Sequence, residues 1–320
     1  MKKELLKYYR DQDKKFPMLS RYGRNLNVQY LTGKLEPCYH RQMQIAQIQK
    51  ILLRRNKANA LLTGVPGCGK TAIVEGLAAA ITERRLVYEK ATMEAQKAAA
   101  AAAEDPAALK DLPLMPEKPI GYDWVIYEIS INAMVSGTKY RGDFEERVQD
   151  LVDECKGQPN LILFVDEFHM VCTAGRAEGC YSASQILKPA LARGDIRLIG
   201  ATTTDEKAMI MEDGAFARRF SEVVVQELTG EAALKTARQV LGNYCKHHKV
   251  KTAVKADELL EQVEFFLPGT VFPDNFINVV DETLAGAVFD GRDTVSMAHF
   301  NGTLSRITGS VILTANNSCA

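Results

Sequence analysis

Apolar and polar positions follow a strand-then-helix order along the first two thirds of this 320-residue chain. Short apolar or β-branched runs predict strands, and they lie at Ala60–Leu62, Trp124–Ser130, Leu161–Val165, Ile196–Ala201 and Glu222–Val225. The run Leu161–Val165 (LILFV) has no polar alternation, which is typical of a central parallel strand covered on both faces. The pattern therefore predicts an α/β fold, with a parallel sheet and flanking helices.

Apolar residues at helical spacing fill the stretches between these strands. One such stretch follows the turn at 36–41, and a second follows a glycine-rich loop that ends near residue 70. A third covers Ser182–Ala192. Asp143 precedes another such stretch and, with Glu146 three residues on, fits a helix-capping box. After residue 227 helical patterns recur without strands, at Glu231–Tyr244, Ala256–Phe266, Asp274–Val288 and Ser296–Ile307.

These patterns divide the chain into three parts. Residues 1–25 are charged and too short for a domain, so we expect an N-terminal arm. Residues 26–226 form the α/β domain, and residues 227–320 form a smaller, mostly helical domain. Within the α/β domain, 94–119 is rich in alanine and proline, which predicts an exposed helical spur and a proline-rich return. A partner-binding role and a solvated insertion both remain open for it.

The stretch ALLTGVPGCGKT, residues 60–71, places a glycine-rich loop between a strand and a helix. It fits the pattern G-x-x-x-x-G-K-[ST] of a phosphate-binding P-loop. Glycines let several backbone N–H groups approach one anion without an intervening Cβ. The following helix turns its positive end toward the same phosphates. Lys70 then supplies a charge for the β- and γ-phosphates, and Thr71 supplies a hydroxyl for Mg²⁺.

Asp166 and Glu167 directly follow the apolar strand Leu161–Val165. Open α/β sheets bind ligands at the carboxyl ends of their strands. Downstream of a P-loop, this pair fits a second nucleotide motif, in which Asp166 holds Mg²⁺ through water and Glu167 polarises the attacking water. Threonines 202–204 end the next strand, and a hydroxyl there can reach the γ-phosphate or its water.

Composition restricts the function classes. Lys+Arg and Asp+Glu both number 40, and this zero net charge argues against phosphate-backbone binding to nucleic acid. No apolar run approaches the roughly 20 residues of a membrane span. The seven cysteines show no C-x-x-C spacing, so we expect reduced thiols and a cytoplasmic protein. His247 and His248 lie in a lysine-rich break and are expected to be exposed to solvent.

Together, the motifs resemble the first ATPase module of the Clp-type AAA+ unfoldases, the ClpA/ClpB group. The resemblance spans about 22–225 and continues more loosely to about 309. It rests on YGRNLNVQYLTGKLEP, GVPGCGKTAIVEGLA, KYRGDFEERV, LILFVDEFH, AGRAEG, LKPALARG, IGATTTDE and ARRF. It implies an AAA+ ATPase domain followed by a helical lid. It also implies Mg²⁺-dependent hydrolysis of ATP in a hexameric homo-oligomer that moves a polypeptide substrate.

The resemblance assigns roles to individual residues. Asp166 and Glu167 match the Mg²⁺ and hydrolytic carboxylates, and Thr203 matches the sensor threonine, with Thr202 as the near alternative. Arg218 and Arg219 match the arginine fingers that act on the next subunit's γ-phosphate. The residues matching the nucleotide loop are Gly64, Pro66, Gly67, Cys68, Gly69, Lys70 and Thr71. Those matching the substrate-gripping pore loop are Lys139, Tyr140, Arg141 and Gly142, and a second pore loop matches Ala174–Gly179.

The sequence also departs from the family pattern. Cys38-Tyr39-His40-Arg41 replaces an apolar pair followed by Gly-Arg. We recognise no counterpart of the substrate-recruitment domain, the second ATPase module, the middle domain or the loop that docks on the ClpP protease. Two other functions remain open. The missing recruitment domain favours an assembly ATPase that remodels a dedicated partner without threading it. The other is a nucleic-acid-loading ATPase, against which the zero net charge and KYRG in the pore position argue.

Overall fold

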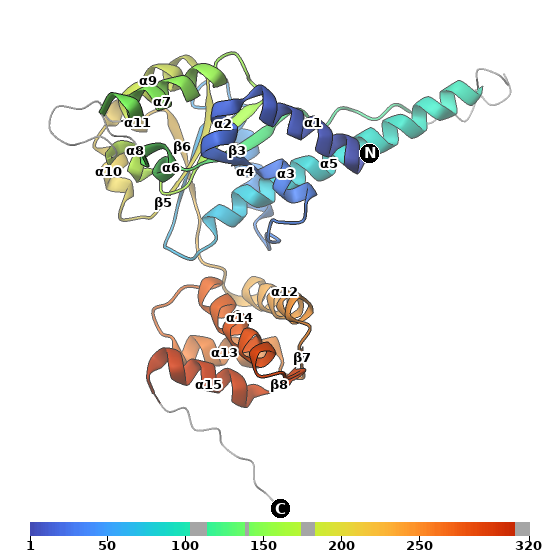
Figure 1. Cartoon of the computed structure of the whole chain (residues 1–320), viewed down its shortest axis with the longest axis vertical. Coiled ribbons are helices and arrows are strands. Elements are labelled where there is room, and N and C mark those ends of the chain that lie inside the picture. The colour runs from blue at the N-terminus through green and yellow to red at the C-terminus, as the bar shows by residue number, and fades with distance from the viewer. Residues whose placement is uncertain (103–113, 138–140, 174–182, 311–320) are drawn as a thin grey trace, which may run out of the picture. The chain divides into compact units, whose positions relative to one another are not determined.

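The computed structural model describes residues 1–102, 114–137, 141–173 and 183–310. The chain forms two compact units. The larger comprises Met1–Thr63 and Lys70–Val224, and the smaller comprises Gly64–Gly69 and Val225–Ala320. Figure 1 shows a sheet with flanking helices in the larger unit and a cluster of helices in the smaller one.

A six-stranded sheet forms the centre of the larger unit, in the order β1-β3-β4-β5-β2-β6. The predicted strands all form, and they pair in parallel. Both β2 and β4 are buried along their whole length, as expected of central strands with helices on both faces. The predicted α/β fold is thus confirmed, with strands β2 (Asn59–Thr63), β3 (Val125–Ile129), β4 (Leu161–Val165), β5 (Arg197–Thr202) and β6 (Phe220–Val224).

Helices cover both faces of this sheet (Figure 1). One layer contains α2 (Pro17–Tyr22), α7 (Arg141–Cys155) and α9 (Ala183–Arg193). The other layer contains α3 (Leu26–Leu31), α4 (Gln42–Leu52) and α5 (Lys70–Ala102). Shorter helices follow strands β3, β4 and β5: α6 (Ile131–Val135), α8 (His169–Thr173) and α10 (Lys207–Met211), respectively. Another short helix, α11 (Gly214–Ala217), precedes β6.

The N-terminal segment is part of the larger unit, so the expectation of an arm at 1–25 is wrong. Helix α1 (Lys2–Lys15) buries Leu5 and Tyr9 in the core, and β1 (Gly23–Asn25) pairs antiparallel with β3. The guanidinium of Arg85 on α5 lies 4.0 Å from the ring centroid of Tyr8. Leu5 and Tyr9 are spaced i, i+4, and even in a segment with many charges such a short apolar stripe is enough to hold one helix against a core.

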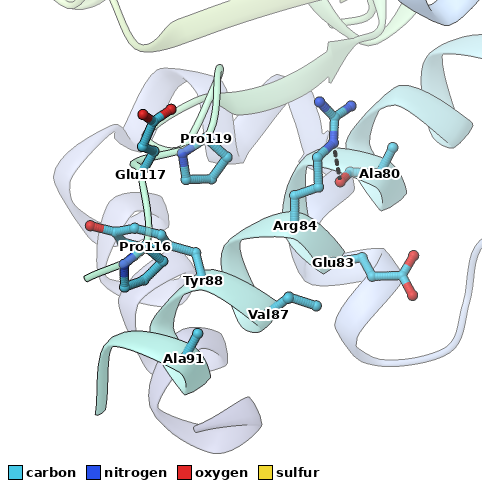
Figure 2. A pocket seen from close by; sticks show the side chains of 9 residues that line it. All are labelled: Ala80, Glu83, Arg84, Val87, Tyr88, Ala91, Pro116, Glu117 and Pro119. Carbon is cyan, nitrogen blue, oxygen red and sulfur yellow. Dashed lines mark hydrogen bonds between the residues drawn. The ribbon is translucent and has the colours of Figure 1, made fainter. Parts of the chain in front are cut away.

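Helix α5 runs without a break from Lys70 to Ala102, so the alanine-rich segment extends the P-loop helix. Residues 114–119 then return beside it. Figure 2 shows Pro116 and Pro119 on one wall and Val87 and Tyr88 on the other wall of a groove of about 540 Å³. The rest of the insertion, 103–113, lies outside the described residues.

The described residues of the smaller unit, up to 310, contain four helices: α12 (Gly230–His248), α13 (Ala256–Phe266), α14 (Asp274–Phe289) and α15 (Met297–Thr308). All four were predicted. A parallel pair of two-residue strands, β7 (Lys251–Thr252) and β8 (Thr294–Val295), was not predicted, because two residues carry no detectable alternation.

Two local predictions are wrong. Helix α7 begins at Arg141, so Asp143 lies within its first turn and is not the N-cap, although a carboxylate there still complements the helix dipole. The His248 side chain is only 15% exposed, and its Nε2 lies 2.6 Å from Oδ1 of Asp281 on α14. That partner is 33 residues away along the chain, beyond any local pattern.

Candidate nucleotide site

The glycine-rich loop at 64–69 connects β2 to α5, as predicted. Gly67 and Gly69 have φ values of 78° and 89°, a conformation that side chains with a Cβ rarely adopt. At Gly64, a Cβ atom would lie 2.3 Å from the carbonyl oxygen of Val225, so glycine is required there for space. Lys70 and Thr71 are the first residues of α5, where backbone N–H groups have no partner within the helix.

Thr71 and Asp166 are 95 residues apart in sequence but meet in the structure. The Thr71 hydroxyl donates to Oδ2 of Asp166, at 2.5 Å. A hydroxyl oxygen and a carboxylate oxygen at one point are ligands that suit Mg²⁺, so these two residues fit the predicted ion.

Glu167 stands beside this pair with an exposed side chain. Its φ is 49°, a left-handed conformation that is uncommon for residues other than glycine. Its backbone N–H donates to Oδ1 of Asp166, at 2.9 Å. The turn therefore directs the two consecutive carboxylates differently: Asp166 toward α5 and Glu167 toward solvent.

Phe168 anchors this turn in the core. Its ring is fully buried and contacts the rings of Phe216 and Phe220 at centroid distances of 5.7 and 5.1 Å. Its backbone N–H donates to the carbonyl oxygen of Ala201 on β5, at 2.8 Å. The position of Glu167 thus depends on how closely Phe168 approaches β5.

We expect Gly200→Ala to destabilise the protein by about 1–3 kcal/mol, the usual cost of overpacking. A Cβ at Gly200 would lie 2.7 Å from the Phe168 ring and 3.1 Å from Leu61 Cδ1. Denaturant unfolding measures the loss. The matched control is Gly286→Ala, inside α14 with no atom within 4 Å of the added Cβ, which should stabilise the protein by about 0.5–1 kcal/mol. Equal stability of Gly200→Ala and the unmodified protein would contradict this account of the turn.

The threonine turn after β5 is tied to Glu206, a residue the sequence analysis did not single out. Thr203 donates to Oε2 of Glu206 through both its backbone N–H (3.1 Å) and its hydroxyl (2.7 Å). The Thr203 hydroxyl also accepts from the Glu206 backbone N–H, at 3.2 Å. The Thr202 hydroxyl reaches the same carboxylate at 3.5 Å. The spacing T-x-x-E is a capping-box signal that could have revealed this pair.

Arg218 and Arg219 directly follow α11 and have exposed side chains. In the described part of the chain, no hydrogen bond or ion pair joins them to Thr71, Asp166 or Glu167. The backbone is fixed nonetheless, because buried Asn59 donates to the carbonyl oxygen of Arg219 (3.1 Å). The same Asn59 side chain accepts from the Leu198 N–H (2.9 Å). The arginines thus project from a rigid base.

The predicted pore-loop residues are not described in the same detail. Lys139 and Tyr140, and the second loop at Ala174–Gly179, lie outside the described residues. Arg141 is the first described residue of α7.

The unusual turn at Cys38–Arg41 packs against the P-loop helix. A Cβ at Gly76 of α5 would lie 2.6 Å from Cys38 Cβ, so the two elements touch at a glycine. Burial raises the pKa of the Cys38 thiol to about 11, which keeps the thiol protonated and unreactive at neutral pH. His40 has a φ of 52°, so it takes a left-handed conformation at the position where the resembling family has glycine.

A parallel sheet, a glycine-rich loop before α5, and a carboxylate pair that reaches the first threonine of that helix define a P-loop nucleotide hydrolase. The chain belongs to the AAA family, whose model, "ATPase family associated with various cellular activities", matches residues 60–228. ATP with Mg²⁺ is the nucleotide chemistry of that family. The predicted family resemblance is confirmed.

Two curated relatives show how far the likeness extends. The chain is 39% identical to the chaperone protein ClpB of Aquifex aeolicus over 287 residues, which is 89% of this chain and 25% of that one. It is 38% identical to the chloroplastic chaperone ClpC1 of Oryza sativa over 84% of this chain and 26% of that one. The chain therefore spans about a quarter of the length of these relatives.

Solved structures of Hsp104 have a similar fold over most of this chain. A closed-state cryo-EM reconstruction of Hsp104 with ATPγS and FITC-casein aligns with 91% of this chain and 45% of that one, at a TM-score of 0.72 and 31% identity. The ADP complex of Hsp104 from S. cerevisiae aligns with 93% of this chain and 47% of that one, at a TM-score of 0.72 and 30% identity. No helix among the described residues is long and apolar enough to cross a membrane.

Proposed function

We propose that this chain is an ATP-driven protein unfoldase of the Clp type, working in a hexameric ring of identical subunits. One observation carries the proposal: the likeness to ClpB covers 89% of the chain and therefore extends beyond the matched ATPase core at 60–228. A solved Hsp104 structure that names casein in its title aligns over 91% of the chain. These relatives support polypeptide as the substrate class.

The nucleotide chemistry follows from the site. The loop glycines Gly64, Gly67 and Gly69 present backbone N–H groups to the ATP phosphates, and Lys70 adds a positive charge. Thr71 and Asp166 would hold Mg²⁺, which offsets phosphate charge when bound. Glu167 acts as the general base that takes a proton from the attacking water.

Two further groups complete the proposed site. The threonine turn, through Thr203 or Thr202, offers a hydroxyl to the γ-phosphate or its water. Arg218 and Arg219 are exposed, and within the described ranges no hydrogen bond or ion pair joins them to Thr71, Asp166 or Glu167 of their own chain, so we assign them to the site of the neighbouring subunit. There they offset the charge that develops on the phosphate.

Polypeptide is proposed to be gripped by Lys139, Tyr140 and Arg141 in the centre of the ring. A flat ring with a polar hydroxyl contacts many kinds of side chain with little sequence preference. No disulfide involves the five cysteines among the described residues, which supports a reducing compartment such as the cytoplasm.

Tyr140→Ala tests the proposed function directly. We expect basal ATP hydrolysis within about twofold of the unmodified protein, because the substitution leaves the P-loop and both carboxylates intact, and at least a tenfold loss of unfolding, because the aromatic grip is removed. Release of fluorescence from a tagged folded substrate measures unfolding.

The control is Tyr140→Phe, which keeps the ring and should keep most of the unfolding. Unchanged unfolding by Tyr140→Ala would contradict threading. The same ATPase assay with unfolded casein and with single-stranded DNA separates the substrate classes, because only the true substrate should stimulate turnover.

A further inference from the structure

The Glu206 carboxylate lies between two turns of the proposed active site. On one side it accepts the N–H and the hydroxyl of Thr203. On the other side, its Oε2 lies 3.1 Å from Nδ1 of His169, the first residue of α8. Glu206 is thus placed to connect the turn after β5 with the turn after β4.

The second contact bears on Glu167. His169 is only two residues after Glu167, and the residue between them, Phe168, is fully buried. The backbone hydrogen bond from Phe168 to Ala201 already joins the turn after β4 to the end of strand β5. The His169–Glu206 contact, an ion pair when the imidazole is protonated, joins them at a second point. Two separated tethers restrain the rotation of a turn, whereas one tether leaves it free to pivot.

The surroundings favour an ionised Glu206. The Thr203 hydroxyl first, then the Thr203 N–H and His169, hold the pKa of Glu206 below its ordinary value despite partial burial. The side chains of His169 and Glu206 are 17% and 33% exposed, so water screens the contact only in part. A charged acceptor forms stronger hydrogen bonds than a neutral one.

We propose that Glu206 is a positioning residue for ATP hydrolysis, which holds Thr203 and His169 and so sets where the threonine turn stands relative to the Glu167 carboxylate. This inference rests on the proposed nucleotide chemistry, but it does not depend on protein unfolding. Because the Thr203 hydroxyl gives its proton to Glu206, its oxygen is left to accept from the attacking water. A base and such an acceptor act on one water only within a narrow geometry, and a displacement near 1 Å can cost about 10²-fold in rate.

The test uses the full chain with ATP and Mg²⁺. We expect Glu206→Ala to lower kcat by about 10- to 100-fold, because both turns lose their shared tether. The KM for ATP and the affinity for a fluorescent ADP analogue should stay within about threefold, because the P-loop is unchanged. Glu206→Gln should recover part of kcat, since its amide oxygen still accepts from Thr203.

The charge-matched control is Asp205→Asn, one residue away, exposed, and expected to leave kcat unchanged. A double-mutant cycle with His169→Ala gives the readout that a purely structural role would not move. If Glu206 acts through His169, the two losses of kcat overlap, and the double variant is little slower than Glu206→Ala alone. Sedimentation velocity confirms that the variants form equal assemblies.

The outcomes are distinct. Unchanged kcat in a folded Glu206→Ala, or multiplicative losses in the cycle, would overturn the positioning role. A parallel rise in KM would show a binding role instead and would also overturn it. If Glu206→Ala does not fold, Glu206→Gln replaces it in the double-mutant cycle with His169→Ala, and the same criteria for kcat apply. If the unmodified protein does not hydrolyse ATP, both the proposed function and this inference are contradicted.

Discussion

Glu167→Gln is expected to lower ATP hydrolysis by about 10²–10⁴-fold, the usual contribution of a general base. Glutamine has nearly the shape of glutamate but cannot take a proton from water. Nucleotide affinity should be retained, because Lys70, Thr71 and Asp166 are unchanged and the Glu167 N–H bond to Asp166 comes from the backbone. Steady-state turnover, together with the affinity for a fluorescent nucleotide, separates the two effects.

The matched control is Glu264→Gln, an exposed glutamate on α13 of the helical unit, which should hydrolyse ATP at the unmodified rate. Normal turnover by Glu167→Gln would show that another group activates the water. Because Glu167 holds a left-handed φ of 49°, unfolding curves should accompany the assay to show that the turn still folds.

Mixing Arg219→Ala with Lys70→Ala is expected to restore activity that neither variant has alone. Each variant alone should lose about 10³-fold or more, the scale for removing an arginine finger. If the finger acts on the neighbouring subunit, an interface with an intact Lys70 on one side and an intact Arg219 on the other is functional. Random mixing in equal amounts makes roughly a quarter of the interfaces complete, so we expect about that share of the unmodified turnover.

Subunit exchange must be demonstrated in this experiment, for example by energy transfer between two labels. Lys70→Ala mixed with itself is the control and should stay inactive. No recovery in rings shown to be mixed would place the guanidinium in its own subunit's site. We propose the neighbour's site because the Arg219 side chain is exposed while its backbone is held by Asn59.

The sheet and the nucleotide loop could be predicted from the sequence because their signals are local. Leu161–Val165 is apolar at every position, and such a run is stable only when both faces are covered. The glycines of the loop were recognisable because positive φ at Gly67 and Gly69 restricts which residue types can stand there. The Asp166–Glu167 pair was recognisable because it directly follows an apolar strand downstream of the P-loop.

The contacts between distant segments could not be predicted. The N-terminal helix looked like a free arm, yet it packs its apolar residues into the core and its Tyr8 on Arg85. Asp143 fitted a cap until α7 proved to begin two residues earlier. The role inferred for Glu206 depends on His169, 37 residues before it, and no spacing rule relates the two.

Residue types and their spacing along the chain were thus sufficient to indicate a P-loop ATPase with a helical domain after it. Local steric and hydrogen-bonding preferences act over a few residues, and these are what a linear pattern records. Which surfaces come together is set by the packing of whole elements. That packing brings Thr71 to Asp166, presses Phe168 against Gly200 and places Glu206 between two turns.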